Sequence, residues 1–336
     1  MAGGYVKAKH QAAGHDGNFT DELETLFFKP TNAIEVDFYQ KFSQSSRQEE
    51  SEGINLSSWM PTFLGTLQLG FPENVSANAF LQSSDMEVPK NVASITNASS
   101  SSSIAANQEK PIIVLDNLLR KFKSPNIMDV KLGKVLHDDS CSEDKKSRLQ
   151  KVSNDTTSGT LGFRICGLKI QKNELSIGLD TKFCESDDED YVAVNKFYGR
   201  SLTADNVEDA FKMYFARDYL TQLQRESLCD VFQKRLMLLY NTLLDEDVRL
   251  ISSSLLFIYE GDPSSWEELG DRHELLEANY DPDSSDSEDE NAGSKCLSSL
   301  SLIDFAHSRH VPGQGYDENV VMGVESLLQI FSNISS

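Results

Sequence analysis

The sequence predicts an α+β protein, because patterns typical of strands and patterns typical of helices both occur along its 336 residues. Ile112 to Leu115 and Leu255 to Tyr259 are compact apolar runs with the length of buried strands. Apolar side chains recur at helical spacing from Val207 to Phe215 and from Leu228 to Leu239, and we expect them to pack in a core. A chain of this length is sufficient for one large domain or two lobes.

Further patterns give the order of the elements. Residues 5 to 40 predict strands, a turn and a short helix. Strand-like runs follow at Trp59 to Leu69, Leu161 to Ile170 and Leu302 to Ala306. A last helix buries apolar side chains between Val320 and Phe331.

The composition of two segments predicts flexible inserts. Residues 83 to 109 are poor in apolar side chains and include five consecutive serines, Ser99 to Ser103. Such a segment cannot bury enough surface to offset its ordering entropy. The segment at about 281 to 296 begins with six acids in ten residues, interleaved with serines, and predicts a second disordered insert.

The charge is unevenly distributed. A formal net charge of −22 argues against direct binding to nucleic acid or to an anionic membrane. From Arg120 to Lys172, however, twelve Lys and Arg stand against six Asp and Glu, which gives a local charge of +6. This basic island suits a small, highly charged anion, and the competing interpretation is an ordinary solvated surface.

The chain carries no targeting or cross-linking pattern. Because no run of eighteen apolar residues and no secretory signal occurs, we expect neither a membrane span nor secretion. The five cysteines form no CxxC pair, so we expect free thiols in a reducing compartment, the nucleus or the cytoplasm.

The segment Pro125 to Gly133 carries the strongest chemical signal. If it is a strand, alternation places Met128, Val130 and Leu132 on one face and Asp129 with Lys131 on the other. An adjacent anion and cation suit phosphoryl transfer, which requires a positioned hydroxyl and charge stabilisation. From spacing alone, a surface ion pair is the simpler interpretation.

The pattern Pro-x-x-x-Asp-x-Lys-x-Gly at residues 125 to 133 resembles the signature of the inositol polyphosphate kinase family. Ser253 to Leu256 and Ile303 to Phe305 resemble the Ser-Ser-Leu-Leu and Ile-Asp-Phe segments of that family, in the same order. Further stretches resemble the fungal multikinases of the family: Ala13 to Gly17, Leu161 to Ile170, Phe197 to Arg200 and Gly315 to Asn319. The resemblance runs from about His10 to Phe331 and omits the two inserts.

The resemblance implies a bilobal fold related to the protein kinases, with ATP between the lobes. A small N-terminal lobe with an antiparallel sheet would comprise residues 1 to 118, including the insert at about 83 to 109. A larger mixed C-terminal lobe would comprise residues 119 to 336. It would contain an inositol-phosphate-binding segment at about 134 to 160 and the acidic insert at about 281 to 296.

The implied cofactors are ATP and Mg²⁺. Lys29 matches the lysine that contacts ATP phosphates, and either Glu35 or Asp37 would pair with it. Asp116 and Leu118 belong to the segment that matches the hinge to adenine; relatives often have Glu in place of Asp116, so the backbone contact is the firmer expectation.

The resemblance also implies metal-binding and catalytic residues. Asp304 matches the magnesium ligand that bridges the nucleotide phosphates, and Ser254 is expected near the metal. Lys131 matches the lysine that contacts the incoming inositol phosphate. Asp129 would contact either the ribose or the attacking hydroxyl, so Asp129 and Lys131 are the predicted catalytic pair.

The basic island supplies the predicted substrate contacts. Lys145, Arg148 and Lys151 recur at three-residue spacing, which predicts one helical face within the inositol-binding segment. The full predicted set for the inositol phosphate is Lys131, Lys145, Arg148, Lys151, Arg164, Lys169, Lys196 and His307. We expect six of them to converge on one pocket beside Asp129, because Lys and Arg both suit phosphate: Lys131, Lys145, Arg148, Lys151, Arg164 and Lys196.

The predicted activity is transfer of the γ-phosphoryl group of ATP to hydroxyls of inositol tris- and tetrakisphosphates, giving up to the pentakisphosphate. A strict trisphosphate kinase and a hexakisphosphate kinase share the central motifs, and the overall resemblance favours the multikinase. The alternative is a nuclear scaffold for MADS-box transcription factors that control arginine metabolism, with kinase activity secondary. The acidic insert would then be a contact element for transcription factors.

Overall fold

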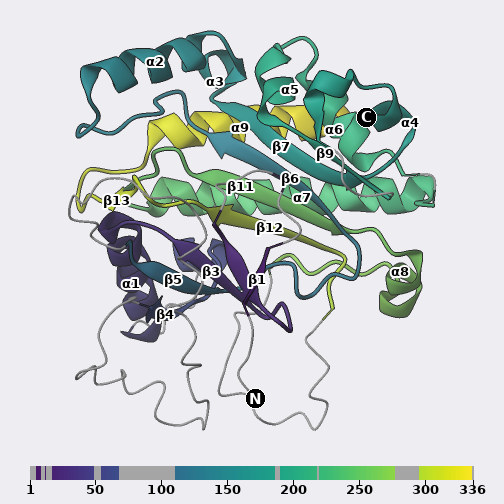
Figure 1. The fold of residues 1–336 in the computed structure, drawn as a ribbon, viewed down its shortest axis with the longest axis horizontal. Helices are drawn as coiled ribbons and strands as arrows, with labels where there is room; N and C mark the ends of the chain where they lie inside the picture. The colour runs from purple at the N-terminus through teal and green to yellow at the C-terminus, as the bar shows by residue number, and fades with distance from the viewer. Residues whose placement is uncertain are drawn as a thin grey trace, which may run out of the picture.

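The computed structural model describes residues 5–8, 12, 17–48, 54–67, 110–185, 190–217, 219–276 and 295–334, with the side chains of 44–48 excepted. The two predicted inserts, apart from Lys295 and Cys296, and the segment Ala13 to Asp16 lie outside the described residues. Two antiparallel sheets with helices around them confirm the predicted α+β class (Figure 1).

The first sheet is formed near the N-terminus and has the strand order β1-β2-β3-β5-β4. Its strands are β1 (Tyr5–Lys7), β2 (Phe19–Asp21), β3 (Leu26–Pro30), β4 (Phe63–Leu67) and β5 (Ile112–Asp116). Helix α1 (Ala33–Gln48) lies beside this sheet (Figure 1). The Asn32 Oδ1 atom accepts a hydrogen bond from the backbone N–H of Glu35 at 3.0 Å, as an N-cap residue does.

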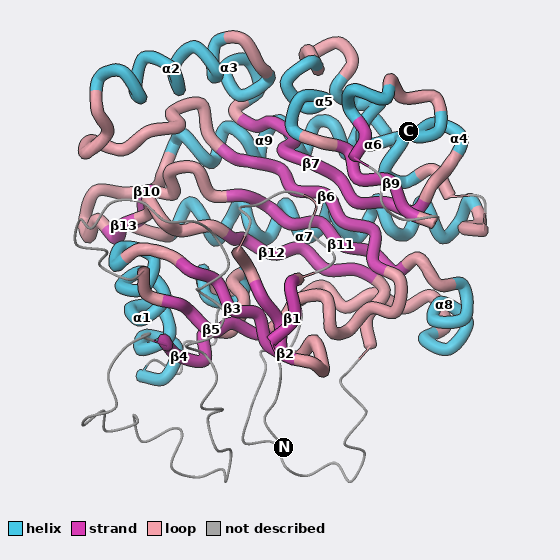
Figure 2. The backbone as a smooth tube through the Cα atoms, in the orientation of Figure 1, coloured by secondary structure: helices cyan, strands magenta, loops and turns pink. Residues whose placement is uncertain are grey.

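The second sheet has the strand order β12-β11-β6-β7-β9-β8, and its strands lie side by side in Figure 2. Its strands are β6 (Pro125–Leu132), β7 (Phe163–Gln171), β8 (Cys184–Glu185), β9 (Tyr191–Val194), β11 (Ser254–Glu260) and β12 (Ser298–Ile303). A separate pair is formed by β10 (Val248–Arg249) and β13 (Arg309–His310). In the register of β6 with β11, Asp129 lies opposite Leu256 and Lys131 opposite Ser254.

Helices cover the far face of the second sheet as viewed in Figure 1. Helices α7 and α9 run behind its strands, and their buried apolar side chains join one continuous core with Met128, Val130 and Leu132. The bounds are α2 (Glu143–Asn154), α3 (Thr157–Leu161), α4 (Glu174–Ile177), α5 (Lys196–Ser201), α6 (Val207–Phe215), α7 (Gln222–Asp245), α8 (Pro263–Leu269) and α9 (Glu318–Ile334). Short 3-10 turns occupy η1 (Leu56–Trp59) and η3 (Thr181–Phe183).

The predicted helices at Val207, Leu228 and Val320 are confirmed, while three predicted strand boundaries shift. The run from Trp59 begins in η1, and its strand starts at Phe63. Leu161 ends α3, because Gly162 adopts φ 70° and turns the chain into β7. The strand predicted at Leu302 to Ala306 is β12, which ends at Ile303, because Asp304 follows with φ 67°, a left-handed conformation that no strand continues.

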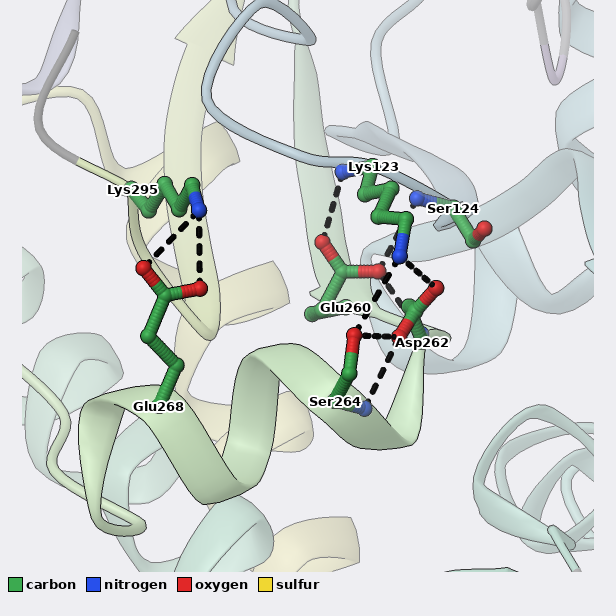
Figure 3. Close-up of polar contacts among 7 residues, drawn as sticks. All are labelled: Lys123, Ser124, Glu260, Asp262, Ser264, Glu268 and Lys295. Carbon is green, nitrogen blue, oxygen red and sulfur yellow. Dashed lines mark hydrogen bonds and ion pairs between the residues drawn. The ribbon is translucent and has the colours of Figure 1, made fainter. Parts of the chain in front are cut away.

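The linker between the two sheets is fixed at one end by a buried carboxylate (Figure 3). Glu260, 1 % exposed, accepts hydrogen bonds from the backbone N–H groups of Lys123, Ser124 and Asp262 at 2.7–2.9 Å. The Lys123 ammonium pairs with Asp262 at 2.6 Å. The linker therefore enters β6 in one defined direction. The predicted lobe boundary at 118/119 lies within this linker, between β5 and β6.

Within the described residues, no helix combines the length and apolarity needed to cross a bilayer.

Candidate active site

A cavity of about 710 Å³ lies between the two sheets and receives side chains from both. The first sheet and its linker contribute Lys29, Asp116 and Leu118, and β6 of the second sheet contributes Asp129 and Lys131. Residues far apart in sequence therefore share one space. The cavity is also lined by Thr31, Glu35, Asp138, Lys145, Arg164, Ser252, Asp304 and His307.

Lys29 joins the two sides of the cavity. Its Nζ atom lies 2.8 Å from Glu35 Oε1 and 2.6 Å from Asp304 Oδ1. Burial by itself lowers the pKa of Lys29, but attraction to the Asp304 and Glu35 carboxylates outweighs it and raises the pKa. Lys29 therefore remains a cation on the wall where a nucleotide phosphate is expected.

Glu35 is the partner of Lys29, which resolves the choice that the sequence left open. The Glu35 side chain is fully buried and also accepts hydrogen bonds from the Thr31 hydroxyl and the Phe305 backbone N–H. Asp37 instead pairs with Lys41 at 2.9 Å on the surface. Two residues along a helix turn a side chain by about 200°, so Asp37 points away from the cavity.

Asp129 and Lys131 face the cavity from β6, as strand alternation predicts, while Met128 and Val130 point into the core. The Lys131 Nζ atom donates a hydrogen bond to the carbonyl of Ser252 at 2.5 Å. Burial and the neighbouring Asp304 carboxylate raise the pKa of Asp129 to about 6, against the opposing attraction of Lys131. The Asp129 carboxylate therefore titrates closer to neutral pH than an ordinary aspartate does.

Two buried oxygens near this pair meet no hydrogen-bond partner of standard geometry among the described residues, although the proximity of the Ser254 hydroxyl lowers the pKa of Asp129 in the way a weak hydrogen bond does. They are Asp129 Oδ1 and the hydroxyl of Ser254. Since Ser254 lies directly opposite Lys131 in the sheet register, both oxygens belong to the same region. Buried polar atoms are rarely left unpaired unless a ligand, ion or water completes them.

The side chains present fit a nucleotide with Mg²⁺. Asp304 Oδ1 contacts Lys29, and the side chain keeps 40 % exposure toward solvent. No group of three or more His, Cys, Asp and Glu suited to a metal occurs among the described residues. Mg²⁺ is commonly held by one or two carboxylates together with substrate phosphates, so the Asp304 carboxylate, with Ser254 opposite the neighbouring Ile303 in the sheet register, fits such an ion.

The hinge segment also suits a nucleotide base. Asp116 lines the cavity, but its Oδ1 atom is 2.6 Å from the Arg120 Nε atom. The backbone N–H groups of Asp116 and Asn117 donate to the carbonyls of Thr62 and Thr25. Because these groups are engaged, the backbone of Leu118 is the better candidate for an adenine contact.

The basic residues separate into two groups. Lys131, Lys145, Arg164 and His307 line the cavity. Arg164 is 9 % exposed, and its Nη1 atom donates to the Ser158 hydroxyl at 2.9 Å. Four basic side chains from separate segments therefore line one cavity, and three of them, Lys131, Lys145 and Arg164, belong to the basic island.

Four of the predicted substrate contacts, Arg148, Lys151, Lys169 and Lys196, do not line the cavity, so the convergence expected for Arg148, Lys151 and Lys196 is not observed. Lys151 pairs with Asp155 at 2.7 Å, Lys169 lies over the Tyr191 ring, and Lys196 lies over the Phe197 ring. Helix α2 forms as expected, but three-residue steps drift by about 60° each. By Lys151 the direction has turned about 120° from that of Lys145.

Asp138 is a polar residue of the cavity to which the sequence assigned no role. Asp138 lies in the loop before α2, and its Oδ2 atom is 2.5 Å from the Nδ1 atom of His307. The two residues are 169 positions apart, so no sequence signal could have paired them.

The chain resembles known proteins over nearly its whole length. The family model for inositol polyphosphate kinase matches residues 112–332. An inositol polyphosphate multikinase of Saccharomyces cerevisiae is 45% identical over 97% of this chain and 98% of its own length. A multikinase of Schizosaccharomyces pombe is 29% identical over 96% of this chain and 95% of its own length.

A solved structure gives the same relationship. The inositol phosphate multikinase Ipk2 of S. cerevisiae, in complex with ADP and Mn²⁺, superposes with a TM-score of 0.72 and 42% identity. The match covers 93% of this chain and all of the Ipk2 chain.

The arrangement of two antiparallel sheets around the cavity is therefore the protein-kinase-like fold seen in Ipk2. The family match and the high identity define the group more narrowly: the chain belongs to the inositol polyphosphate kinase family, and its predicted activity as an inositol polyphosphate kinase is confirmed at that level.

Proposed function

We propose that this kinase uses ATP and Mg²⁺ to phosphorylate more than one inositol polyphosphate, converting tris- and tetrakisphosphates to products up to the pentakisphosphate. The observation that carries the proposal is the cavity, in which the Lys29–Glu35–Asp304 cluster and the Asp129–Lys131 pair lie together. Support for several acceptors, in preference to one, comes from the two yeast relatives, both of which are multikinases.

On the nucleotide side, Lys29 contacts ATP phosphates, and Glu35 holds Lys29 in position through the 2.8 Å ion pair. Asp304, with Ser254 close by, binds the metal. When bound, Mg²⁺ would neutralise the negative charge that develops on the transferred phosphoryl group. Leu118 contributes a backbone contact to adenine, and Asp116 orders the hinge through Arg120.

On the acceptor side, Asp129 and Lys131 act on the hydroxyl and on the transferred group. A carboxylate with a pKa of about 6 is ionised at pH 7 and remains basic enough to accept a proton. This favours contact of Asp129 with the attacking hydroxyl over contact with the ribose. Lys131 offsets the negative charge that develops in the transition state.

The phosphates already on the inositol ring bind Lys145, Arg164 and His307 at the cavity wall. These groups come from three different segments of the chain. A cavity of about 710 Å³ has the size of sites that hold small molecules.

Product analysis tests the proposal. The full chain is incubated with ATP, Mg²⁺ and inositol trisphosphate, and the products are separated by anion-exchange chromatography. Successive appearance of tetrakis- and pentakisphosphate is expected. A single phosphorylation that stops at the tetrakisphosphate would contradict the multikinase proposal while leaving the kinase family assignment intact.

The role in transcription, through MADS-box factors that control arginine metabolism, stays a prediction, as does the nuclear and cytoplasmic location. The acidic insert on which the contact with transcription factors was predicted lies outside the described residues apart from its last two. No observation in the described residues favours this second function.

A further inference from the structure

The cavity that would bind a polyanion contains the acidic side chain of Asp138, whose charge is unfavourable for phosphate binding. Asp138 lines the cavity, where a free carboxylate would repel a phosphate. Its two oxygens are, however, both engaged. Oδ1 accepts hydrogen bonds from the Ser140 backbone N–H at 3.0 Å and from the Ser140 hydroxyl at 2.6 Å. Oδ2 lies 2.5 Å from His307 Nδ1, and the Asp138 side chain is only 11% exposed.

The direction of the hydrogen bond to His307 follows from the charge of Asp138. Burial raises the pKa of Asp138, but the hydrogen bonds from Ser140 and His307 outweigh that effect and lower it. An ionised carboxylate has no proton to donate, so Nδ1 of His307 must be the donor. The other ring nitrogen, Nε2, is then the atom of His307 available to a ligand in the cavity.

We propose that Asp138 is a positioning residue: its carboxylate accepts the Nδ1 proton of His307 and holds the ring so that Nε2 faces a phosphate of the inositol substrate, to which it donates a hydrogen bond in the imidazolium form, with both nitrogens protonated. The same contact neutralises the charge of Asp138 toward the substrate. This inference rests on the proposed function, because it assigns the partner of His307 to the inositol phosphate.

The contact also connects two parts of the site. Asp138 belongs to the loop that leads into α2, which carries Lys145, and His307 follows Asp304 by three residues. A carboxylate bonded to one nitrogen of a histidine fixes both the orientation of the ring and the position of its proton. Losing this contact should therefore affect binding of the inositol phosphate more than the transfer step or ATP binding.

The principal test is steady-state kinetics of Asp138→Asn in the full chain, with inositol trisphosphate and ATP varied in turn. Asparagine keeps an oxygen for the Ser140 N–H, so the turn is retained, but it carries no charge to hold the His307 proton. The KM for inositol trisphosphate is expected to rise about five- to tenfold, the difference between a charge-assisted and a neutral hydrogen bond. The kcat and the KM for ATP are expected to change little.

Asp139→Asn is the matched control, because Asp139 is the next residue, is 95% exposed and pairs with Arg309 at 3.2 Å on the surface. Wild-type kinetics are expected for it. In a His307→Gln background, Asp138→Asn should add no further loss, because its effect acts through His307. Three results would each overturn the proposal. The first is that Asp138→Asn raises the KM for inositol trisphosphate in the His307→Gln background as much as it does alone. The others are an unchanged KM for Asp138→Asn, or an equal rise in KM for Asp139→Asn.

A second measurement does not depend on a variant of Asp138. In the ¹⁵N-histidine NMR spectrum of the wild-type chain, with the His307 signal assigned by its loss in His307→Gln, Nδ1 is expected to carry a proton. An unprotonated Nδ1 would overturn the proposal. If the wild-type chain fails to phosphorylate inositol trisphosphate, it is the proposed function that fails, which distinguishes the two results.

Discussion

Two buried carboxylates on neighbouring strands of the second sheet have opposite surroundings. Glu260 on β11 accepts three backbone hydrogen bonds and is 1% exposed. Asp129 on β6 is 6% exposed, has an oxygen without a partner of standard hydrogen-bond geometry among the described residues and has a pKa raised to about 6. A fully satisfied carboxylate stabilises the fold, whereas an incompletely satisfied one is left available for substrate.

The largest effect should come from Asp304, the carboxylate whose negative charge raises the pKa of Asp129. Asp304→Asn removes the proposed metal ligand and half of the ion pairing of Lys29. We expect turnover to fall at least about 100- to 1000-fold with the fold retained, since electrostatic stabilisation of the transition state is lost. Initial rates with saturating ATP and circular dichroism measure the two properties.

Asp37→Asn is the control for that variant, because Asp37 is an exposed acid paired with Lys41. It is expected to retain wild-type turnover. Near wild-type activity for Asp304→Asn would remove Asp304 from the mechanism.

The direct comparison exchanges each carboxylate for its amide. Asp129→Asn should lose most turnover, because the amide cannot accept the proton of the attacking hydroxyl, and should lose no unfolding free energy near neutral pH, because it replaces a buried carboxylate with a neutral group of the same shape. Glu260→Gln should retain turnover and lose about 1–3 kcal/mol of unfolding free energy, because an amide nitrogen would face a backbone N–H donor. Urea denaturation and initial rates distinguish the two, and the reverse pattern would refute the division between structural and functional carboxylate.

The cations should divide in the same way. Lys131→Ala removes a cavity lysine, so the kcat/KM for the inositol phosphate should fall roughly ten- to a hundredfold for a charge-assisted contact of about 1.5–3 kcal/mol. Lys145→Ala and Arg164→Ala should have smaller effects of the same kind. Lys151→Ala is the matched control, since Lys151 lies on the same helix as Lys145 and pairs with Asp155 at the surface. Equal losses for Lys131→Ala and Lys151→Ala would contradict the observed separation.

The raised pKa of Asp129 gives a pH-dependent prediction. The native state holds this proton more tightly than the unfolded state, in which the pKa is 3.8. The stability due to Asp129 is therefore fully present below about pH 4 and is lost as the pH rises through about 6. Asp129→Asn lacks this loss, so its unfolding free energy relative to wild type should rise by up to about 3 kcal/mol between about pH 4 and pH 8.

Urea denaturation of both proteins across this pH range measures the difference. A difference that does not vary with pH would mean that the pKa of Asp129 is the same in the folded and unfolded states.

The smallest effect is expected from the two inserts. Deleting residues 90 to 106 and 281 to 293 removes segments with very few apolar side chains. Kinase activity and melting temperature should therefore change little. A large fall in melting temperature would show that these segments contribute to the core.

The sequence by itself determined the local features of this protein. Alternation at Met128 to Leu132 correctly predicts which side chains of β6 face the core and which face the cavity. Helical spacing correctly predicts α6, α7 and α9. These features depend on the repeat of one strand or one helix, which the sequence contains directly.

The tertiary structure alone decided which groups meet. It pairs Lys29 with Glu35 and not Asp37, directs Lys145 but not Lys151 into the cavity, and joins Asp138 to His307. Each of these outcomes depends on which face of an element packs inward, and on the approach of segments far apart in the chain. Periodicity gives the faces of a helix but not their partners, because partners are set by the packing of the whole core.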